Sequence, residues 1–455
     1  MHLHPTTSIR TRILKAGSWS LIGHVASQAI RLGSSLVMTR LLMPEAFGVM
    51  AIANVILFGI ALFSDLGLRQ NIIQSQRGND PIFLNTAWSV QIIRGVGLCV
   101  IGMLVAAAFY LLAQLHFFPA ESVYSEPVLP WVIGALSIVT LINSFESTKL
   151  ASANRNLALG QVTLIELTSQ IIGILLMLAW VYADRSIWAL VAGGVVSSIV
   201  KTALSHVVLP GEKNKLYWDA QSFHEIFHFG KWIFLTSVMG FLISSLDRLL
   251  LGGMIPAEEL GVYSIAVLLA GAFQELVSKL IGSVALPALG EINRLQPTRI
   301  KELYYKIRLP IDLFCLTSAG ILFTSGNAIV DLLYDSRYAQ AGSILSILSL
   351  SLLAYRYGVA GQLYIALGKP KLVAFIMIFR LCMMVLFIPA GFQINGLIGA
   401  TWGITLACLS ELVITLAIKR KLRVFDLRNE LKTLPLFLAG LAIGWLLTYI
   451  LQFIS

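Results

Sequence analysis

The chain has 455 residues, of which 57% are hydrophobic and only 12% are charged, and its mean hydropathy is +0.82. Such a composition leaves too little polar surface for a soluble globular protein, so lipid is the expected solvent. The formal net charge is +10, and it has to be explained by membrane topology, by a nucleic-acid partner, or by both.

The apolar stretches of the sequence predict its membrane-spanning helices. Each crossing of the bilayer's hydrocarbon core, which is about 30 Å thick, takes about 20 mostly apolar residues in a helix. Thirteen stretches meet this requirement, so the sequence predicts an all-α integral membrane protein. The first stretch carries Arg31 and is expected to be a retained span rather than a cleaved signal peptide. In chain order the stretches lie near residues 16–39, 47–67, 86–111, 129–149, 158–181, 187–208, 231–251, 260–286, 308–327, 341–367, 372–390, 396–418 and 434–453.

The charges between the spans give an orientation. If the N-terminus is cytoplasmic and the spans alternate, the cytoplasmic segments hold 23 Lys and Arg and the outer loops hold three. This asymmetry is the positive-inside pattern of a multi-pass membrane protein whose N-terminus lies in the cytoplasm. The basic run Lys419–Arg423 is therefore interpreted as charge that rests on anionic lipid, and no nucleic-acid partner is expected.

An internal repeat divides the chain. Residues 44–53 and 257–266 share five of ten positions, and each segment follows an odd-numbered span. Parallel repeats of this kind are typical of transporters in which two similar bundles move about a shared site. The sequence predicts two pseudo-symmetric six-helix lobes around a central cavity, plus an extra C-terminal helix. The predicted parts are an N-lobe at 1–208, a cytoplasmic linker at 209–230, a C-lobe at 231–418 and a basic loop with the extra helix at 419–455.

Several ionisable residues lie deep inside predicted spans, where a charge is costly and is expected to face a partner or a wet cavity. Four are arginines, and their planar guanidinium groups suit phosphate. One span also carries a polar stripe at three- and four-residue steps that is expected to line the cavity. The candidate ligands of a phosphate-bearing substrate are Arg31, Arg94, Arg356 and Arg380, and the candidate cavity-lining polar residues are His24, Gln28, Ser35 and Glu275.

Other polar residues in or near the predicted spans are expected to have structural roles. Glu275 and Lys279 have the spacing of an ion pair on one helix face, and residues such as Asp312 lie close enough to span ends to reach water. His224 and His228 are four residues apart, but the sequence lacks the pattern of a metalloprotease helix between them. No catalytic motif is present, so neither an enzyme nor a cofactor is expected. A coupling ion, either H⁺ or Na⁺, is left open.

A series of short motifs resembles the polysaccharide-transporter flippases of the multidrug/oligosaccharidyl-lipid/polysaccharide exporter superfamily. Within these motifs, Asp65, Asp247 and Arg248 are expected to build the lobes. The matching stretches are Thr39–Gly48, Asp65–Leu68, Asp247–Gly252 with Glu258–Ser264, Leu286–Leu289, Ala366–Pro370 and Gly396–Ala400.

The resemblance implies export of undecaprenyl-diphosphate-linked oligosaccharide units across the inner membrane, for exopolysaccharide, capsule or O-antigen assembly, by alternating access of two lobes. Polysaccharide polymerase and glycosyltransferase machinery are the partners it implies, together with membrane lipid. The main alternative is a multidrug-type, cation-coupled exporter of the same superfamily, which would favour deep acids over deep arginines. An integral-membrane glycan polymerase or ligase is a further alternative, although the longest outer loop, near 112–128, is short for such an enzyme.

Overall fold

The computed structural model describes residues 9–62 and 67–454, and every secondary-structure element in these ranges is a helix. The prediction of an all-α membrane protein is confirmed. Asp65, one of the residues expected to build the lobes, lies outside the described residues. The chain folds into two compact units: unit 1 comprises Met1–Phe241 and Gly252–Ala257, and unit 2 comprises Leu242–Leu251 and Glu258–Ser455.

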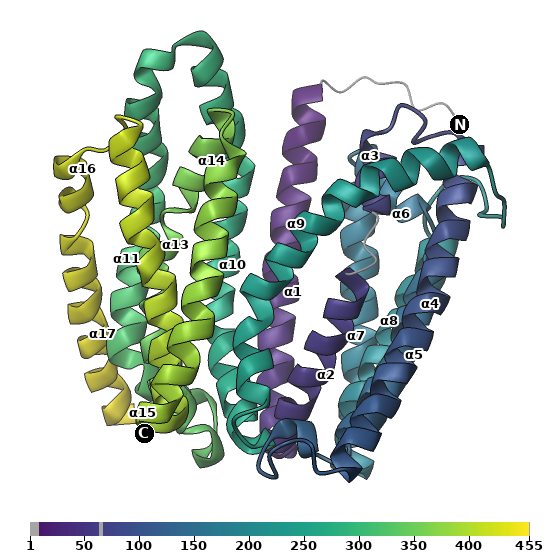
Figure 1. Ribbon diagram of the computed structural model, residues 1–455, viewed down its shortest axis with the longest axis horizontal. Coiled ribbons are helices and arrows are strands. Elements are labelled where there is room, and N and C mark those ends of the chain that lie inside the picture. Colours follow the sequence, from purple (N-terminus) through teal and green to yellow (C-terminus); the bar gives the residue numbers. More distant parts are fainter. Residues whose placement is uncertain (1–8, 63–66, 455) are drawn as a thin grey trace. The chain divides into compact units, whose positions relative to one another are not determined.

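Unit 1 is a bundle of long helices joined by short connections (Figure 1). One helix is broken: α5 and α6 meet at a bend of 62°. The helices are α1 (Ile9–Leu41), α2 (Pro44–Leu62), α3 (Leu68–Gln74), α4 (Pro81–Gln114), α5 (Leu129–Ser144), α6 (Lys149–Arg155), α7 (Leu159–Ala183), α8 (Trp188–Val207) and the first part of α9 (Ala220–Gly252), with a short 3₁₀ turn, η1, at Val123–Ser125.

Unit 2 comprises Leu242–Leu251 of α9 and the chain from Glu258 onward. Its longest helix, α15, has non-helical backbone angles at Asn395 and Gly396, where φ is +51° at the glycine, so two helices meet there. The remaining helices are α10 (Ala257–Leu295), α11 (Ile300–Leu333), α12 (Gln340–Ser349), α13 (Leu352–Tyr355), α14 (Gly358–Ala366), α15 (Pro370–Lys421), α16 (Leu427–Lys432) and α17 (Pro435–Ile454), with 3₁₀ turns η2 (Pro297–Arg299) and η3 (Ser336–Tyr338).

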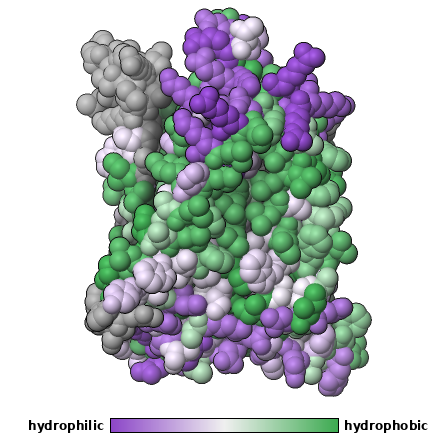
Figure 2. All heavy atoms as spheres, turned by 90° about the vertical axis from the view of Figure 1, so that its left-hand side faces the viewer, coloured by the Kyte–Doolittle hydropathy of each residue, from purple (hydrophilic) through white to green (hydrophobic). Residues whose placement is uncertain are grey.

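Nine of the described helical segments are long and apolar enough to cross a membrane, and the bent pair α5–α6 makes a tenth if it counts as one span. This number treats α15 as a single segment, although its 52 residues exceed what one crossing needs. The multi-pass character is confirmed, while the number thirteen stays a prediction. On the face shown in Figure 2, apolar side chains form a band between two polar margins, as a lipid-embedded protein requires.

Small residues let the helices approach closely, which is the usual basis of packing in lipid. A Cβ on Gly440 of α17 would lie 2.5 Å from the carbonyl oxygen of Thr317 on α11, and one on Gly320 would lie 2.5 Å from the carbonyl oxygen of Phe437. These glycines therefore fix α17 against α11, the two neighbours at one edge of unit 2 in Figure 1. Substituting a larger residue would force the two helices apart.

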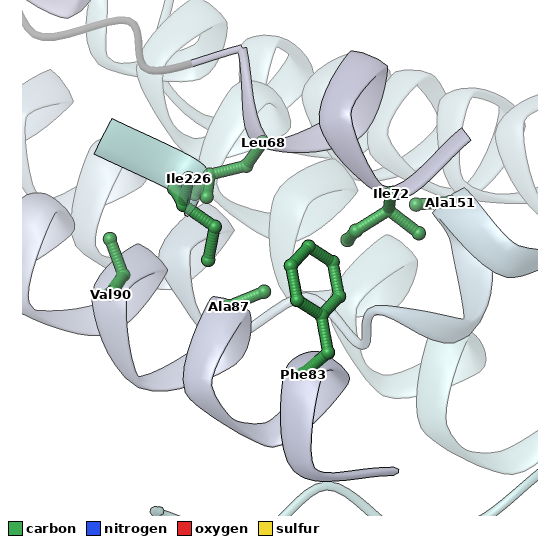
Figure 3. Close-up of a cluster of buried hydrophobic side chains, with 7 residues drawn as sticks. All are labelled: Leu68, Ile72, Phe83, Ala87, Val90, Ala151 and Ile226. Atoms are coloured by element: carbon green, nitrogen blue, oxygen red, sulfur yellow. The ribbon is translucent and has the colours of Figure 1, made fainter. Parts of the chain in front are cut away.

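One end of unit 1 has its own apolar core, drawn in Figure 3. Phe83 of α4 lies at its centre and is fully buried, and Ile226 from the start of α9 closes it from the other side. The cluster joins four helices that are distant in sequence, so the first turns of α9 are anchored to unit 1. Its members are Leu68, Ile72, Phe83, Ala87, Val90, Ala151 and Ile226.

Candidate functional site

The interior of unit 2 contains five ionisable side chains in mutual contact, Arg308, Asp312, Arg356, Lys419 and Glu430, which we call the buried ionic cluster. Arg308 of α11 is fully buried. Its Nε donates to Asp312 Oδ1 at 3.0 Å, one helical turn along, and its Nη1 donates to Glu430 Oε1 at 2.8 Å. A buried charge is tolerated only when it is paired and hydrogen-bonded, and these contacts meet that requirement.

Glu430 of α16 is the centre of the cluster. Besides Arg308, its carboxylate is contacted by the ammonium group of Lys419 at the end of α15. It also accepts hydrogen bonds from the hydroxyl groups of Tyr305, at 2.9 Å, and Tyr357, at 2.7 Å. Four donors from three parts of the chain thus converge on one carboxylate. This convergence ties the short helix α16 to α11, to α15 and to the connection between α13 and α14.

Arg356 lies in that connection and all three of its guanidinium nitrogens donate within the protein. Nε donates to the carbonyl oxygen of Leu353 at 3.2 Å, Nη1 to Thr433 Oγ1 at 3.3 Å, and Nη2 to the Tyr357 hydroxyl at 3.1 Å. The carboxylate of Asp312 is 3.6 Å from Nη1. The prediction that Arg356 lies deep in the protein agrees with its 6% exposure, but its donors are already engaged.

Aromatic rings complete the cluster. The guanidinium carbon of Arg308 lies 4.2 Å from the ring centroid of Tyr357, and the ammonium nitrogen of Lys419 lies 4.5 Å from that of Tyr304. The ring faces carry partial negative charge and stabilise cations at such distances. Three bases against two acids leave the cluster with one surplus positive charge. In addition, Nη2 of Arg308 is buried without a hydrogen-bond partner among the described residues.

Arg380, in the first half of α15, is only partly engaged. Its Nη1 lies 3.8 Å from Glu411 Oε2, in the second half of the same helix, and its side chain is 16% exposed. The Nε of Arg380 is buried and has no hydrogen-bond partner in the described part of the chain. A buried donor without an acceptor is unfavourable. An anionic ligand or a water molecule would satisfy it.

In unit 1, the polar stripe lies on α1 as expected from its spacing. His24, Gln28 and Ser35 are half-buried, and Arg31 is exposed. A neighbouring residue of the same helix contacts α7: the Ser27 hydroxyl donates to Gln170 Oε1 at 2.8 Å. Arg94 of α4 is half-buried and donates from Nη2 to the carbonyl oxygen of Ala61, in the last turn of α2, at 2.7 Å.

The remaining predicted residues lie in α9 and α10. Asp247 is buried, and its Oδ2 accepts a hydrogen bond from the Tyr263 hydroxyl at 2.5 Å. This bond joins two of the family-like motifs, 247–252 and 258–264, and gives a physical reason why they occur together. Arg248 is half-buried and Glu275 is exposed. The structure thus does not bring Glu275 into the buried ionic cluster.

Unit 1 contains a broken helix. At the break between α5 and α6, Gln91 Nε2 donates to the carbonyl oxygens of Ser144 and Glu146 at 2.9 and 3.0 Å. Freed backbone groups need such partners inside a membrane. In unit 2, α12, α13 and α14 follow one another as a single apolar segment, Gln340–Ala366, with no bend above 40°. The break between α5 and α6 falls in the fourth predicted span, and interrupted helices commonly mark transport sites.

The polar end of unit 1 carries a second charged group, outside the spans. Arg77 donates to Asp80 Oδ2 at 2.8 Å, and this hydrogen bond raises the pKa of its guanidinium. Asp219 caps the first turn of α9 by accepting from the backbone N–H of Ser222 at 2.8 Å and from its hydroxyl at 2.6 Å. These hydrogen bonds, with the nearby charge of Arg77, lower the pKa of Asp219.

Most of the buried ionic cluster has no signal in the sequence. The basic run predicts that Lys419 rests on lipid, and the span ends predict that Asp312 reaches water, yet their exposures are 0% and 2%. Both expectations are wrong because α16 folds back over the end of α11 and supplies Glu430. The four-residue spacing of Arg308 and Asp312 is the one local signal of a pair. Nothing in the sequence links Lys419 to Glu430.

The described residues offer no grouping of three or more His, Cys, Asp or Glu side chains that could hold a metal ion. The rings of His224 and His228 lie side by side, with centroids 6.3 Å apart. All four cysteines are free thiols.

Comparison with known proteins identifies the family. The family described as "Polysaccharide biosynthesis protein" matches residues 37–343, about two thirds of the chain. The chain belongs to this family. Over 414 residues it is 22% identical to the lipopolysaccharide biosynthesis protein WzxC of Escherichia coli K12, covering 90% of this chain and 81% of WzxC. It is 18% identical to the succinoglycan biosynthesis transport protein ExoT of Rhizobium meliloti, over 76% of this chain and 67% of ExoT.

Solved structures show the same fold. The inward closed conformation of the lipid II flippase MurJ has a TM-score of 0.69 at 15% identity, covering 97% of this chain and 98% of MurJ. A multidrug resistance MATE family transporter of the MOP superfamily, in its inward-facing conformation, has a TM-score of 0.65 at 14% identity, covering 88% of this chain and 94% of that one. The resemblance drawn from the motifs is confirmed. ExoT is named a transport protein, and the two solved structures are named a flippase and a transporter, in agreement with the prediction of a transporter rather than an enzyme.

Proposed function

We propose that this protein moves diphosphate-linked oligosaccharide units, carried on undecaprenol, from the cytoplasmic to the outer leaflet of the bacterial inner membrane for assembly of a surface polysaccharide. The family membership supports a role in polysaccharide biosynthesis. The names of WzxC and ExoT associate these relatives with lipopolysaccharide and succinoglycan. Movement would proceed by alternating access of the two predicted lobes, 1–208 and 231–418, with the N-terminus in the cytoplasm.

The observation that carries the proposal is the unfilled donor of Arg380. The Arg380 guanidinium is mostly buried, lies 3.8 Å from the carboxylate of Glu411 and 5.8 Å from the ring centroid of Tyr355, and still lacks an acceptor for Nε, which a phosphate oxygen would supply. We assign Arg380 to the diphosphate, while Arg31 and Arg94 stay candidate ligands predicted from the sequence. Arg356 is assigned a positioning role, because its three nitrogens already donate to Leu353, Tyr357 and Thr433.

The test replaces Arg380 without leaving a buried acid unpaired. Arg380→Ala alone would strand Glu411, so the informative variant is the double substitution Arg380→Ala, Glu411→Gln. Its matched control is Arg294→Ala, which removes an exposed arginine at the end of α10. With equal protein in the membrane, we expect the double variant to lose export and to accumulate lipid-linked oligosaccharide on the cytoplasmic leaflet, while the control exports normally. Normal export by the double variant would show that Arg380 does not bind the substrate.

The alternative hypothesis is a multidrug-type exporter. The fold shared with a MATE family transporter is compatible with this hypothesis. A cationic substrate would be disfavoured by the surplus positive charge of the buried ionic cluster and by the exposed or half-buried arginines of α1 and α4. The discriminating assay adds a cationic dye to cells that express the protein. We expect no export of the dye, and dye export lost in the Arg380 variant would favour the multidrug hypothesis.

A further inference from the structure

The polar margin of unit 2 contains a cavity of about 520 Å³ where the start of α11 meets α16. Both elements belong to the basic segments that the charge pattern predicts to face the cytoplasm. The cavity is separate from Arg380 and its partners, none of which lines it. Its lining includes Thr298, Lys306, Leu309, Asn429 and Lys432, with Asp312 and Thr433 among the others.

The lining of this cavity carries three lysines and three acids, but two of the acids have their partners outside the lining. Each lining acid has a basic partner: Glu302 pairs with Arg299 at 3.1 Å, Asp426 with Lys301 at 3.0 Å, and Asp312 with Arg308 in the buried ionic cluster. Two lining bases, Lys306 and Lys432, are exposed and make neither an ion pair nor a hydrogen bond with the described residues. The cavity therefore presents two available ammonium groups to an anion.

The cavity also contains neutral hydrogen-bond donors and apolar side chains, and these indicate which class of anion it would bind. The hydroxyl of Thr298 and the side-chain amide of Asn429 line the same cavity and can donate to phosphate oxygens. Next to it, Leu309 and Leu313 of α11 are 50% and 51% exposed, one helical turn apart. Leu438 of α17 is 65% exposed. Exposed leucines thus extend from the cavity along α11, as expected where polar residues meet the apolar part of a membrane helix.

We propose that this cavity binds the headgroup phosphate of an anionic phospholipid, held by Lys306 and Lys432, with the acyl chains along the exposed leucines of α11 and α17. A basic pocket at the cytoplasmic ends of membrane helices is suited to such a headgroup. The leucines would add apolar contact that a free phosphate ion cannot make. This lipid would be a structural ligand of unit 2, and it does not depend on what the protein transports.

The test measures lipid binding to the purified full-length chain. The protein in neutral detergent is titrated with phosphatidylglycerol or phosphatidylcholine, and bound lipid is counted by native mass spectrometry. The variant is Lys306→Gln, Lys432→Gln. The matched control, Lys369→Gln, Lys371→Gln, removes two exposed lysines from the same unit outside the cavity. We expect phosphatidylglycerol to bind in preference to phosphatidylcholine, and the cavity variant to bind it roughly 30-fold more weakly, which corresponds to about 2 kcal/mol.

Three outcomes would overturn the proposal. Equal loss of phosphatidylglycerol in the cavity variant and in the control would show that only the total charge matters. Equal binding of phosphatidylcholine would show that the headgroup charge does not matter. Displacement of the lipid by millimolar inorganic phosphate would assign the cavity to a free ion rather than to a phospholipid. Loss of binding in the cavity variant alone, without displacement by phosphate, supports the site even if transport is unaffected.

Discussion

Glu430→Gln is the perturbation that tests the buried ionic cluster most sharply. The substitution keeps the shape of the side chain but removes its charge, and Lys419 and Arg308 then lose a common carboxylate partner. Three bases would face Asp312 alone, so the net charge of the cluster would rise from one to two. Removing one partner of a buried pair typically costs about 3–5 kcal/mol. For a unit of some 200 residues this corresponds to a fall in the unfolding midpoint of roughly 6–20 °C.

A double-mutant cycle separates this charge effect from a loss of packing. Lys419→Met in the Glu430→Gln background returns the net charge of the cluster to its original value, so the second substitution should recover about 1–3 kcal/mol. The assay is thermal unfolding in detergent, followed by size-exclusion chromatography of the heated protein. Glu302→Gln, which removes an exposed acid of α11, is the control and should leave the midpoint unchanged. An unfolding midpoint for Glu430→Gln equal to that of the wild type would show that this carboxylate does not stabilise the buried ionic cluster.

Two further predictions concern helix packing and pH. Gly440→Ala places a methyl group 2.5 Å from the Thr317 carbonyl oxygen and should destabilise the protein by about 1–3 kcal/mol. The control Gly361→Ala, whose added methyl group would have no atom within 4 Å, should leave the stability unchanged. Equal unfolding midpoints of the two variants would exclude the close glycine packing of α11 and α17. Because the pKa of Asp219 lies below its ordinary value of 3.8, its stabilisation is complete above that value and is lost as the pH falls through the lowered pKa. Asp219→Asn should therefore reduce the loss of stability between about pH 5 and pH 2 in the same unfolding assay, and an unchanged pH profile would contradict the cap.

Much of the fold follows from the sequence because each span satisfies its own backbone and carries its own apolar signal. The break between α5 and α6 lies at the end of a predicted span, and nothing apolar distinguishes it. It is supported by Gln91 and His206, which reach the freed carbonyl oxygens of Ser144, Glu146 and Phe145 from other helices. Such support is a property of the packed bundle and has no signature in the segment that breaks.

The candidate site was predictable only in part. Arg356 is buried and Arg380 is half-buried, as their depth within predicted spans suggests, whereas Arg31 and Glu275, predicted to be equally deep, are exposed. The partners of these arginines could not be found in this way: Glu411 lies 31 residues from Arg380, and Thr433 lies 77 from Arg356. Whether an arginine is engaged within the protein or available to a ligand depends on such distant partners. Composition and periodicity do not contain that information.

Transport of lipid-linked oligosaccharide across the membrane is tested most directly by reconstitution. The purified protein is placed in vesicles that contain undecaprenyl-diphosphate-linked oligosaccharide, and the amount of substrate that becomes accessible to a glycosidase added outside is measured. We expect the wild-type protein to expose this substrate from the inner leaflet and the Arg380→Ala, Glu411→Gln variant not to do so. Vesicles with wild-type protein that expose no more substrate than protein-free vesicles would contradict the proposed transport.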